Sequence, residues 1–161
     1  MASTSYLARV IFKEHTKDGD FAGTYKLLVK AKSIPSPASK PNTVESTTLE
    51  DDTQTFEMGI KTSDSKEIKG NLEKEYLDGI EDLNGKKLDI IHLYGTDGVG
   101  GVAKYAYVGQ AVATPDDVGG TDEILGMTAT VIPNTAAKKV TDELEVTDNK
   151  DGTFTVAKAS V

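Results

Sequence analysis

Hydrophobic and polar residues alternate along three segments of the chain, with the period of two that is typical of β-strands. The segments are residues 24–32, 102–114 and 124–133, and the second is also rich in valine, tyrosine and alanine. In the first, every second residue from Tyr25 is apolar, and most of those between are lysines. The apolar face of the third comprises Leu125, Met127, Ala129 and Val131. The pattern therefore predicts three strands, each with one buried face.

The C-terminal stretch LEVTDNKDGTFTV predicts a β-hairpin. Its turn carries Asp151-Gly152, a pair that favours tight turns. Four apolar residues would face one another across this turn: Leu144 and Val146 on one strand, Phe154 and Val156 on the other. Residues 139–161 are therefore expected to form a C-terminal arm or hairpin.

One segment has the spacing of an amphipathic helix instead. Its apolar residues recur on one helical face, which would brace the sheet; they are Leu72, Tyr76, Leu77, Ile80 and Leu83. Asn71 is a suitable N-cap, and Asn84-Gly85 supplies the left-handed end that helices favour. Gly79 in the middle costs roughly 1 kcal/mol relative to alanine, so packing must hold the helix in place.

The strand predicted next, residues 88–94, is apolar at nearly every position except Asp89 and His92. A strand of this kind is buried on both faces. We therefore expect a mainly β fold, a β-sandwich or open barrel with one packed α-helix, and a single domain over residues 1–161.

Two polar segments lack a regular pattern, and we expect both to be irregular. Residues 33–42 carry three prolines, which interrupt strand ladders. Residues 50–65 are acidic and rich in threonine and serine, with Phe56, Met58 and Ile60 embedded among them. Long polar loops of this kind commonly belong to binding surfaces.

Composition narrows the functional classes. The 161 residues are 37% hydrophobic and 27% charged, with no cysteine, which favours a soluble domain made in the cytoplasm. No apolar run approaches the ~20 residues that span a bilayer, and the N-terminus lacks the layout of a signal peptide. The net charge is −8 and Arg9 is the single arginine, which argues against a protein that grips nucleic acid. An acidic surface would instead suit a conduit through which DNA slides without sticking.

The candidate chemical sites are weak. His15 and His92 are too few for a zinc site without cysteine, and we interpret them as an exposed turn residue and a hydrogen-bonded core residue. GIEDLNGKK lacks phosphate-loop spacing, YGTDGVGG lacks a complete dinucleotide fingerprint, and DNKDG lacks the flanking carboxylates of a calcium loop. The acidic trio Glu50-Asp51-Asp52 is better interpreted as a solvated loop than as a cation site. We therefore expect no enzyme, bound metal or cofactor.

From about residue 23 to 137, the order of short motifs resembles that of the tail tube (major tail) proteins of siphophages infecting Gram-positive bacteria. In that family a Val-Glu-x-Thr-Thr-Leu strand leads into an acidic loop, an aromatic residue and a Gly-Leu/Ile pair. A second strand, a helix ending Leu-x-Gly-Lys, a buried strand and a Pro-x-Thr turn follow. The matching residues are Val44, Glu45, Thr47, Thr48, Leu49, Asp52, Phe56, Gly59, Ile60, Leu83, Gly85, Lys86, Asp89 and Tyr94, and then Met127, Thr128, Thr130, Ile132, Pro133 and Thr135.

The resemblance implies a structural protein of the virion tail, made in the cytoplasm of the host bacterium. It would form homohexameric rings whose strands join into a lumenal barrel and which stack into a hollow tube around a tape-measure protein. Tail-tip and tail-terminator proteins would close its ends, and DNA would pass without specific binding. Residues 48–65 are then the best ring-stacking segment and residues 33–42 the second. The inter-ring or inter-subunit candidates are Thr48, Leu49, Asp51, Asp52, Phe56, Met58 and Ile60.

Other classes stay open. A monomeric β-sandwich binding module of the surface carbohydrate or adhesin type would need a concave aromatic patch, and the chain has no tryptophan. A small hydrolase would need a site that the sequence does not reveal. Phe56 and Ile60 could also fold back onto their own domain instead of contacting a partner.

Overall fold

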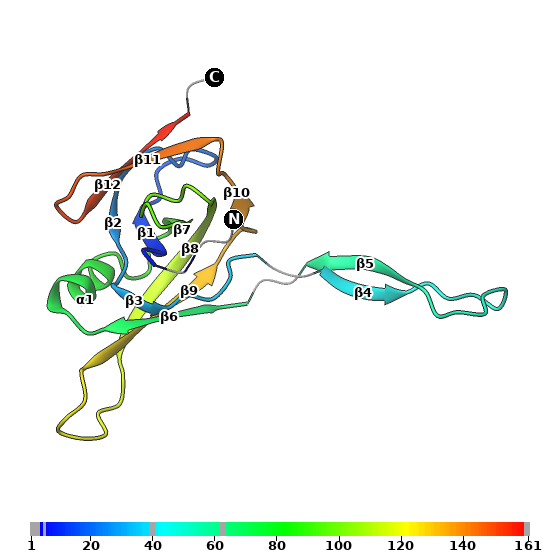
Figure 1. Cartoon of the computed structure of the whole chain (residues 1–161), viewed down its shortest axis with the longest axis horizontal. Coiled ribbons are helices and arrows are strands. Elements are labelled where there is room, and N and C mark those ends of the chain that lie inside the picture. The colour runs from blue at the N-terminus through cyan, green and yellow to red at the C-terminus, as the bar shows by residue number, and fades with distance from the viewer. Residues whose placement is uncertain (1–3, 5, 39–40, 62–63, 160–161) are drawn as a thin grey trace.

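The chain folds into a curled antiparallel sheet, shaped as a half-barrel, with one short helix packed on it (Figure 1). The computed structural model describes residues 4, 6–38, 41–61 and 64–159, the side chains of Ile60 and Lys61 excepted. The strand order is β11-β12-β2-β1-β7-β8-β9-β6-β3, and β10 also pairs with β8. The mainly β fold is therefore confirmed, in its open-barrel form.

The elements of the half-barrel have the following bounds. Its strands are β1 Arg9–Glu14, β2 Gly23–Leu27, β3 Ala31–Ser33, β6 Lys66–Asn71, β7 Leu88–Tyr94, β8 Ala103–Pro115, β9 Gly126–Pro133, β10 Lys138–Lys139, β11 Leu144–Asp148 and β12 Thr153–Lys158, and its helix is α1 Lys74–Glu81. Two further strands, β4 Pro41–Glu45 and β5 Phe56–Lys61, pair with each other in a separate two-stranded sheet.

Two hydrophobic clusters lie on the two faces of the central strands β1 and β7. Alternate residues of β1 divide between them, Val10 and Phe12 on one face and Ile11 on the other. The helix, β6 and β9 complete the first cluster, and the C-terminal hairpin completes the second. The hairpin's contribution is Leu144, Val146, Phe154 and Val156. Strand β7 is consequently buried on both faces, as its almost continuous apolar sequence predicts.

The helix is shorter than its apolar pattern suggests. Ile80 is fully buried, and Leu72, Tyr76 and Leu83 pack around the same cluster, while Leu77 is only half-buried. The prediction that Asn71 caps the helix is wrong: Asn71 ends β6, and Glu73 holds the N-cap position without a side-chain hydrogen bond. Pairing of Asn71 with Gly126 on β9 extends the sheet to this point, so the chain is still extended where a cap would be needed. The prediction that Asn84-Gly85 ends the helix is also wrong: α1 ends at Glu81, and Asp82 holds the C-cap in a right-handed conformation. Gly85 lies in the turn that follows, with a positive φ of 79° that glycine adopts easily.

The strand predicted over residues 24–32 is divided into β2 and β3. Leu28 and Val29 are both buried, which breaks the alternation, and the Leu28 N–H donates to the Val10 carbonyl at 2.9 Å. The chain crosses here from one part of the sheet to its far end, so one strand cannot continue. The strand predicted over residues 124–133 starts later, at Gly126, and leaves Leu125 exposed instead of in the core.

A buried ionic cluster connects β1 with β7. Asp89 is fully buried and lies opposite Lys13 in the strand register, with its Oδ2 2.7 Å from the Lys13 Nζ. Its Oδ1 is 2.7 Å from Nδ1 of His15, whose Nε2 is 2.8 Å from Asp18. The interpretation of His15 as an exposed turn residue is therefore wrong, because its ring is largely buried in contact with the Asp89 carboxylate.

His92 is a hydrogen-bonded core residue, as its apolar strand predicts. Its Nε2 lies 2.9 Å from the Tyr107 hydroxyl, and the side chain is fully buried. Burial lowers the pKa of His92 to about 3, and the charge of Lys66 acts in the same direction. The hydrogen bonds to Asp89 and Asp18 instead raise the pKa of His15 above its ordinary value of 6.5.

The two histidines are expected to titrate on opposite sides of this ordinary value. The stability that His92 contributes is present in full above pH 6.5 and is lost as the pH falls toward 3, because only the unfolded chain takes up the proton. The contribution of His15 is present in full below pH 6.5 and is lost as the pH rises through its folded pKa. Ring-proton NMR titration measures both midpoints, and a His92 midpoint near 6.5 would contradict its burial.

Candidate assembly surface

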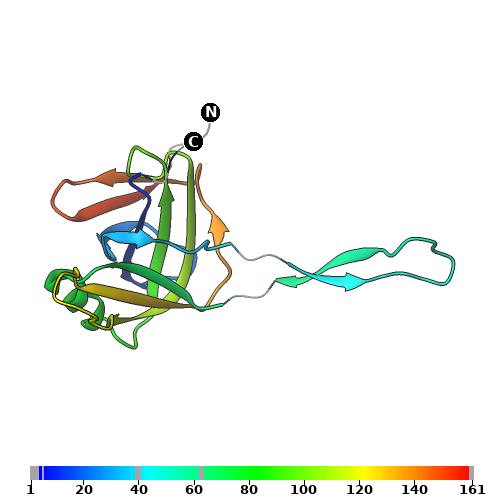
Figure 2. The ribbon, with the colours of Figure 1, turned by 60° about the horizontal axis from the view of Figure 1, so that its bottom comes forward.

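The ribbon formed by β4 and β5, residues 41–61, projects away from the half-barrel (Figures 1 and 2). Its strands pair only with each other, with Thr43 opposite Met58 and Glu45 opposite Phe56. The prediction of an irregular loop over residues 50–65 is thus wrong for β5, and β4 begins inside the proline-rich segment predicted to be irregular. Pro41 is tolerated because it is the first residue of an outer strand, where no ladder donor is required.

Several apolar side chains of this ribbon are in solvent. Phe56 is 56% exposed and Met58 81%, and the register places both on the same face as Thr43 and Glu45. Val44 is 55% exposed on the opposite face. Phe56 therefore does not fold back onto its own domain. The side chain of Ile60, the third predicted anchor, lies outside the described residues.

The tip of the ribbon is a closed turn built by threonine and aspartate side chains. Asp51 Oδ2 accepts from the Thr48 N–H at 2.8 Å and from its hydroxyl at 3.2 Å, while the Thr47 hydroxyl accepts from the Thr55 N–H at 2.9 Å. Leu49 is fully exposed at this turn. The Thr-rich, acidic composition of the segment is therefore explained by local hydrogen bonding.

Removal of the Asp51 carboxylate is expected to open the tip without unfolding the barrel. In Asp51→Ala the Thr48 amide loses its acceptor, so its hydrogen exchange should accelerate by about tenfold, the size of one charge-assisted hydrogen bond. Asp52→Ala is the matched control, because among the described residues the Asp52 carboxylate accepts only from the adjacent Thr53 hydroxyl. Equal Thr48 exchange in both variants would show that the turn does not depend on Asp51.

The ribbon is also strongly acidic. Residues 41–61 contain one basic residue, Lys61 at the end of β5, and five carboxylates, namely Glu45, Glu50, Asp51, Asp52 and Glu57. Among the described residues of the chain, no group of three or more histidine, cysteine or acidic side chains could hold a metal ion. The three side chains of the acidic trio at the tip are exposed.

A second projection joins β8 to β9 over residues 116–125 (Figure 1). Val118, Ile124 and Leu125 are exposed on it. Sequence reasoning missed this surface because Leu125 continues the apolar alternation of β9. In the structure the sheet starts one residue later, and Leu125 contributes its carbonyl to the Leu72 N–H instead of its side chain to the core.

The remaining sequence motifs are turns. YGTDGVGG connects the antiparallel strands β7 and β8, and the Asp97 carboxylate accepts from the N–H groups of Val99 and Gly101. DNKDG is the hairpin turn between β11 and β12, where Gly152 has a positive φ of 90°. The GIEDLNGKK run carries the end of the helix at Glu81 and the turn that follows, in which Gly85 has a positive φ. These motifs therefore have conformational roles.

No protein-family model matches the sequence, and no curated protein is significantly similar to it. In the part of the chain that the structure describes, no helix combines the length and apolar character needed to cross a membrane.

Proposed function

We propose that this chain is a structural protein that assembles into stacked hexameric rings, forming the hollow tail tube of a siphophage. The observation that carries the proposal is the solvent-exposed β4–β5 ribbon. An isolated two-stranded ribbon is at best marginally stable in water, because it buries little apolar surface. Apolar side chains gathered on such an extension favour a partner that covers them.

The sheet edges favour assembly as well. The half-barrel is not closed on itself, so β3 and β11 stand at the two ends of its strand order. Sheet edges are sites where another chain can add hydrogen bonds, and ring closure removes them. Pairing of such edges between subunits would produce the continuous lumenal barrel that the resemblance implies.

The charge of the chain suits a passage for DNA. With a net charge of −8, the assembled wall would repel a phosphate backbone instead of holding it. The proposed partners are further copies of the chain, a tape-measure protein in the lumen, and tail-tip and tail-terminator proteins at the ends. No catalytic step is part of this role.

Sedimentation velocity over a concentration series tests the proposal. The purified chain is expected to move from monomer to species of six subunits or more as its concentration rises, since the interfaces are formed only between copies. A monomer that persists across the series would contradict the proposal and favour a monomeric binding module.

A further inference from the structure

A groove of about 1140 Å³ runs beside β3, the strand at one end of the sheet. Each of residues 30–34 contributes to its lining, so the groove follows β3 from the residue before this strand to the residue after it. Further lining comes from residues 4 and 6–9, from the ends of β2, β6 and β7, and from Gly95 and Val102 in the turn between β7 and β8. The volume exceeds the ~300–1,000 Å³ of small-molecule pockets, so the groove has the size to receive a polypeptide segment.

The groove is basic and partly apolar. Its lining includes Arg9, Lys30 and Lys32 and no carboxylate. The Arg9 guanidinium forms an ion pair with the Asp148 carboxylate at 3.2 Å, and the Lys30 ammonium lies 4.0 Å from the Glu73 carboxylate. Lys32 is exposed and has no ion pair among the described residues. Tyr6 and Val102 add exposed apolar surface.

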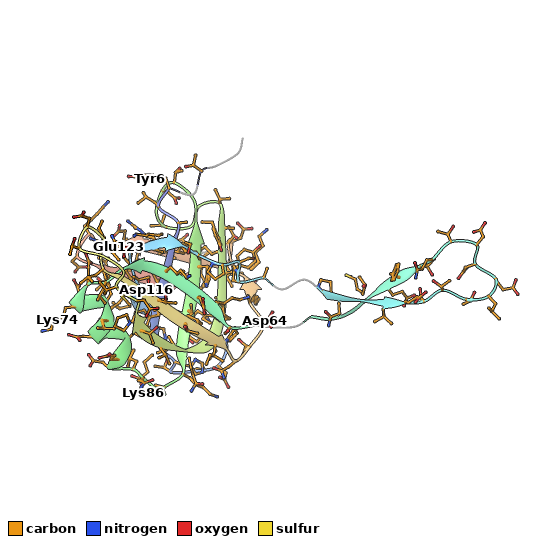
Figure 3. The ribbon with its side chains drawn as sticks, turned by 90° about the horizontal axis from the view of Figure 1, so that it is seen from below. Tyr6, Asp64, Lys74, Lys86, Asp116 and Glu123 are labelled. Atoms are coloured by element: carbon orange, nitrogen blue, oxygen red, sulfur yellow. The ribbon has the colours of Figure 1, made fainter. Side chains whose placement is uncertain are left out.

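We propose that this groove receives the β4–β5 ribbon of a second copy of the chain. This inference deepens the proposed function and rests on it, because it names the surface on which the ribbon docks. The two surfaces are complementary: the ribbon carries five carboxylates and the exposed Phe56 and Met58, and the groove carries lysines beside apolar side chains. The ribbon cannot fill its own groove in this conformation, since it extends away from the barrel surface on which Tyr6 stands (Figure 3).

The ribbon and the edge of β3 make separate contacts. Strand β3 ends the strand order, and within the described part of the chain only β6 pairs with it. Its other edge stays available to a neighbour in the same ring, while the side chains of Phe56 and Met58 of the incoming ribbon enter the groove beside it. Donor and acceptor surfaces are different parts of the same chain. The contact is therefore heterologous, and it repeats from copy to copy along a stack.

Cysteine pairing between copies tests the docking directly, because the chain has no native cysteine. Met58→Cys protein mixed with Val102→Cys protein is expected to give disulfide-linked heterodimers under mild oxidation. Met58→Cys mixed with Val112→Cys is the matched control, since Val112 is another exposed valine of the barrel outside the groove. Docking predicts at least about a tenfold higher yield from the first mixture, because pairing within a complex raises effective concentration.

Charge reversal provides a second readout. Lys30→Glu with Lys32→Glu should weaken self-association by about fivefold or more, and Glu50→Lys with Asp52→Lys in the partner copy should restore it. Equal cross-linking in the two cysteine mixtures, with rings or tubes still formed, would overturn the groove assignment and leave the proposed function intact. Absence of any association in the unsubstituted protein would overturn both.

Discussion

Phe56→Asp is expected to abolish assembly while the barrel stays folded. Phe56 is more than half exposed, and the described side chains of its ribbon lie outside the core clusters, so a charge there should change the free energy of unfolding by no more than ~0.5 kcal/mol. In an assembled interface the same substitution would remove the buried aromatic ring and take a carboxylate out of water, a cost of several kcal/mol that the lysines of the groove offset only in part. Electron microscopy for tubes and circular dichroism for the fold separate these two effects.

Val44→Asp is the control for this substitution. Val44 has almost the same exposure as Phe56 but lies on the other face of the ribbon, opposite Glu57. If the face with Phe56 and Met58 makes the contact, the Val44 variant should assemble far better than the Phe56 variant. Normal tubes from Phe56→Asp protein would show that this side chain is not an anchor.

Asp89→Ala is expected to destabilise the fold by about 3–5 kcal/mol, the largest effect of a single carboxylate in this chain. The substitution leaves the Lys13 ammonium largely buried without its ion-pair partner, and it removes one acceptor of the His15 ring. Urea denaturation should show a lower midpoint. NMR should show a lower His15 pKa than in the unsubstituted protein, because the Asp89 hydrogen bond is the main cause of its elevation.

Glu14→Ala serves as the comparison for this result. Glu14 and Lys86 form an ion pair of 3.8 Å in which both side chains are about half exposed, and such pairs contribute ~0–1 kcal/mol. Similar losses from Asp89→Ala and Glu14→Ala would mean that burial does not set the strength of the Lys13–Asp89 pair.

Several elements that bury one face or both were predicted from the sequence, whereas the central strand β1 and the break between β2 and β3 were not. The apolar run of β7, the alternation of β9 from Met127 to Val131 and the turn at Gly152 each depend on local patterns that the fold preserves. The helix was predicted from the spacing of its apolar residues, but its predicted N-cap, Asn71, was wrong. The register of β6 against β9, which extends to Asn71, is a tertiary constraint that a local cap signal cannot reveal.

The ribbon was harder to predict because its environment is solvent. Phe56 and Met58 alternate with Glu57 as strand residues do. The polar residues that precede and follow them make this alternation too short to predict a strand. The threonine and aspartate side chains of the tip form a hydrogen-bonded turn. From composition alone, the same residues predict an irregular loop. The groove beside β3 combines residues 4, 6–9, 29–34, 94–95 and 102, so only the folded chain brings them together.

Negative-stain electron microscopy of the concentrated, unsubstituted protein shows whether copies of this chain associate through the β4–β5 ribbon and through sheet edges into stacked rings. Rings and hollow tubes of uniform width are the expected result. A field of single, folded monomers at the highest attainable concentration would contradict it.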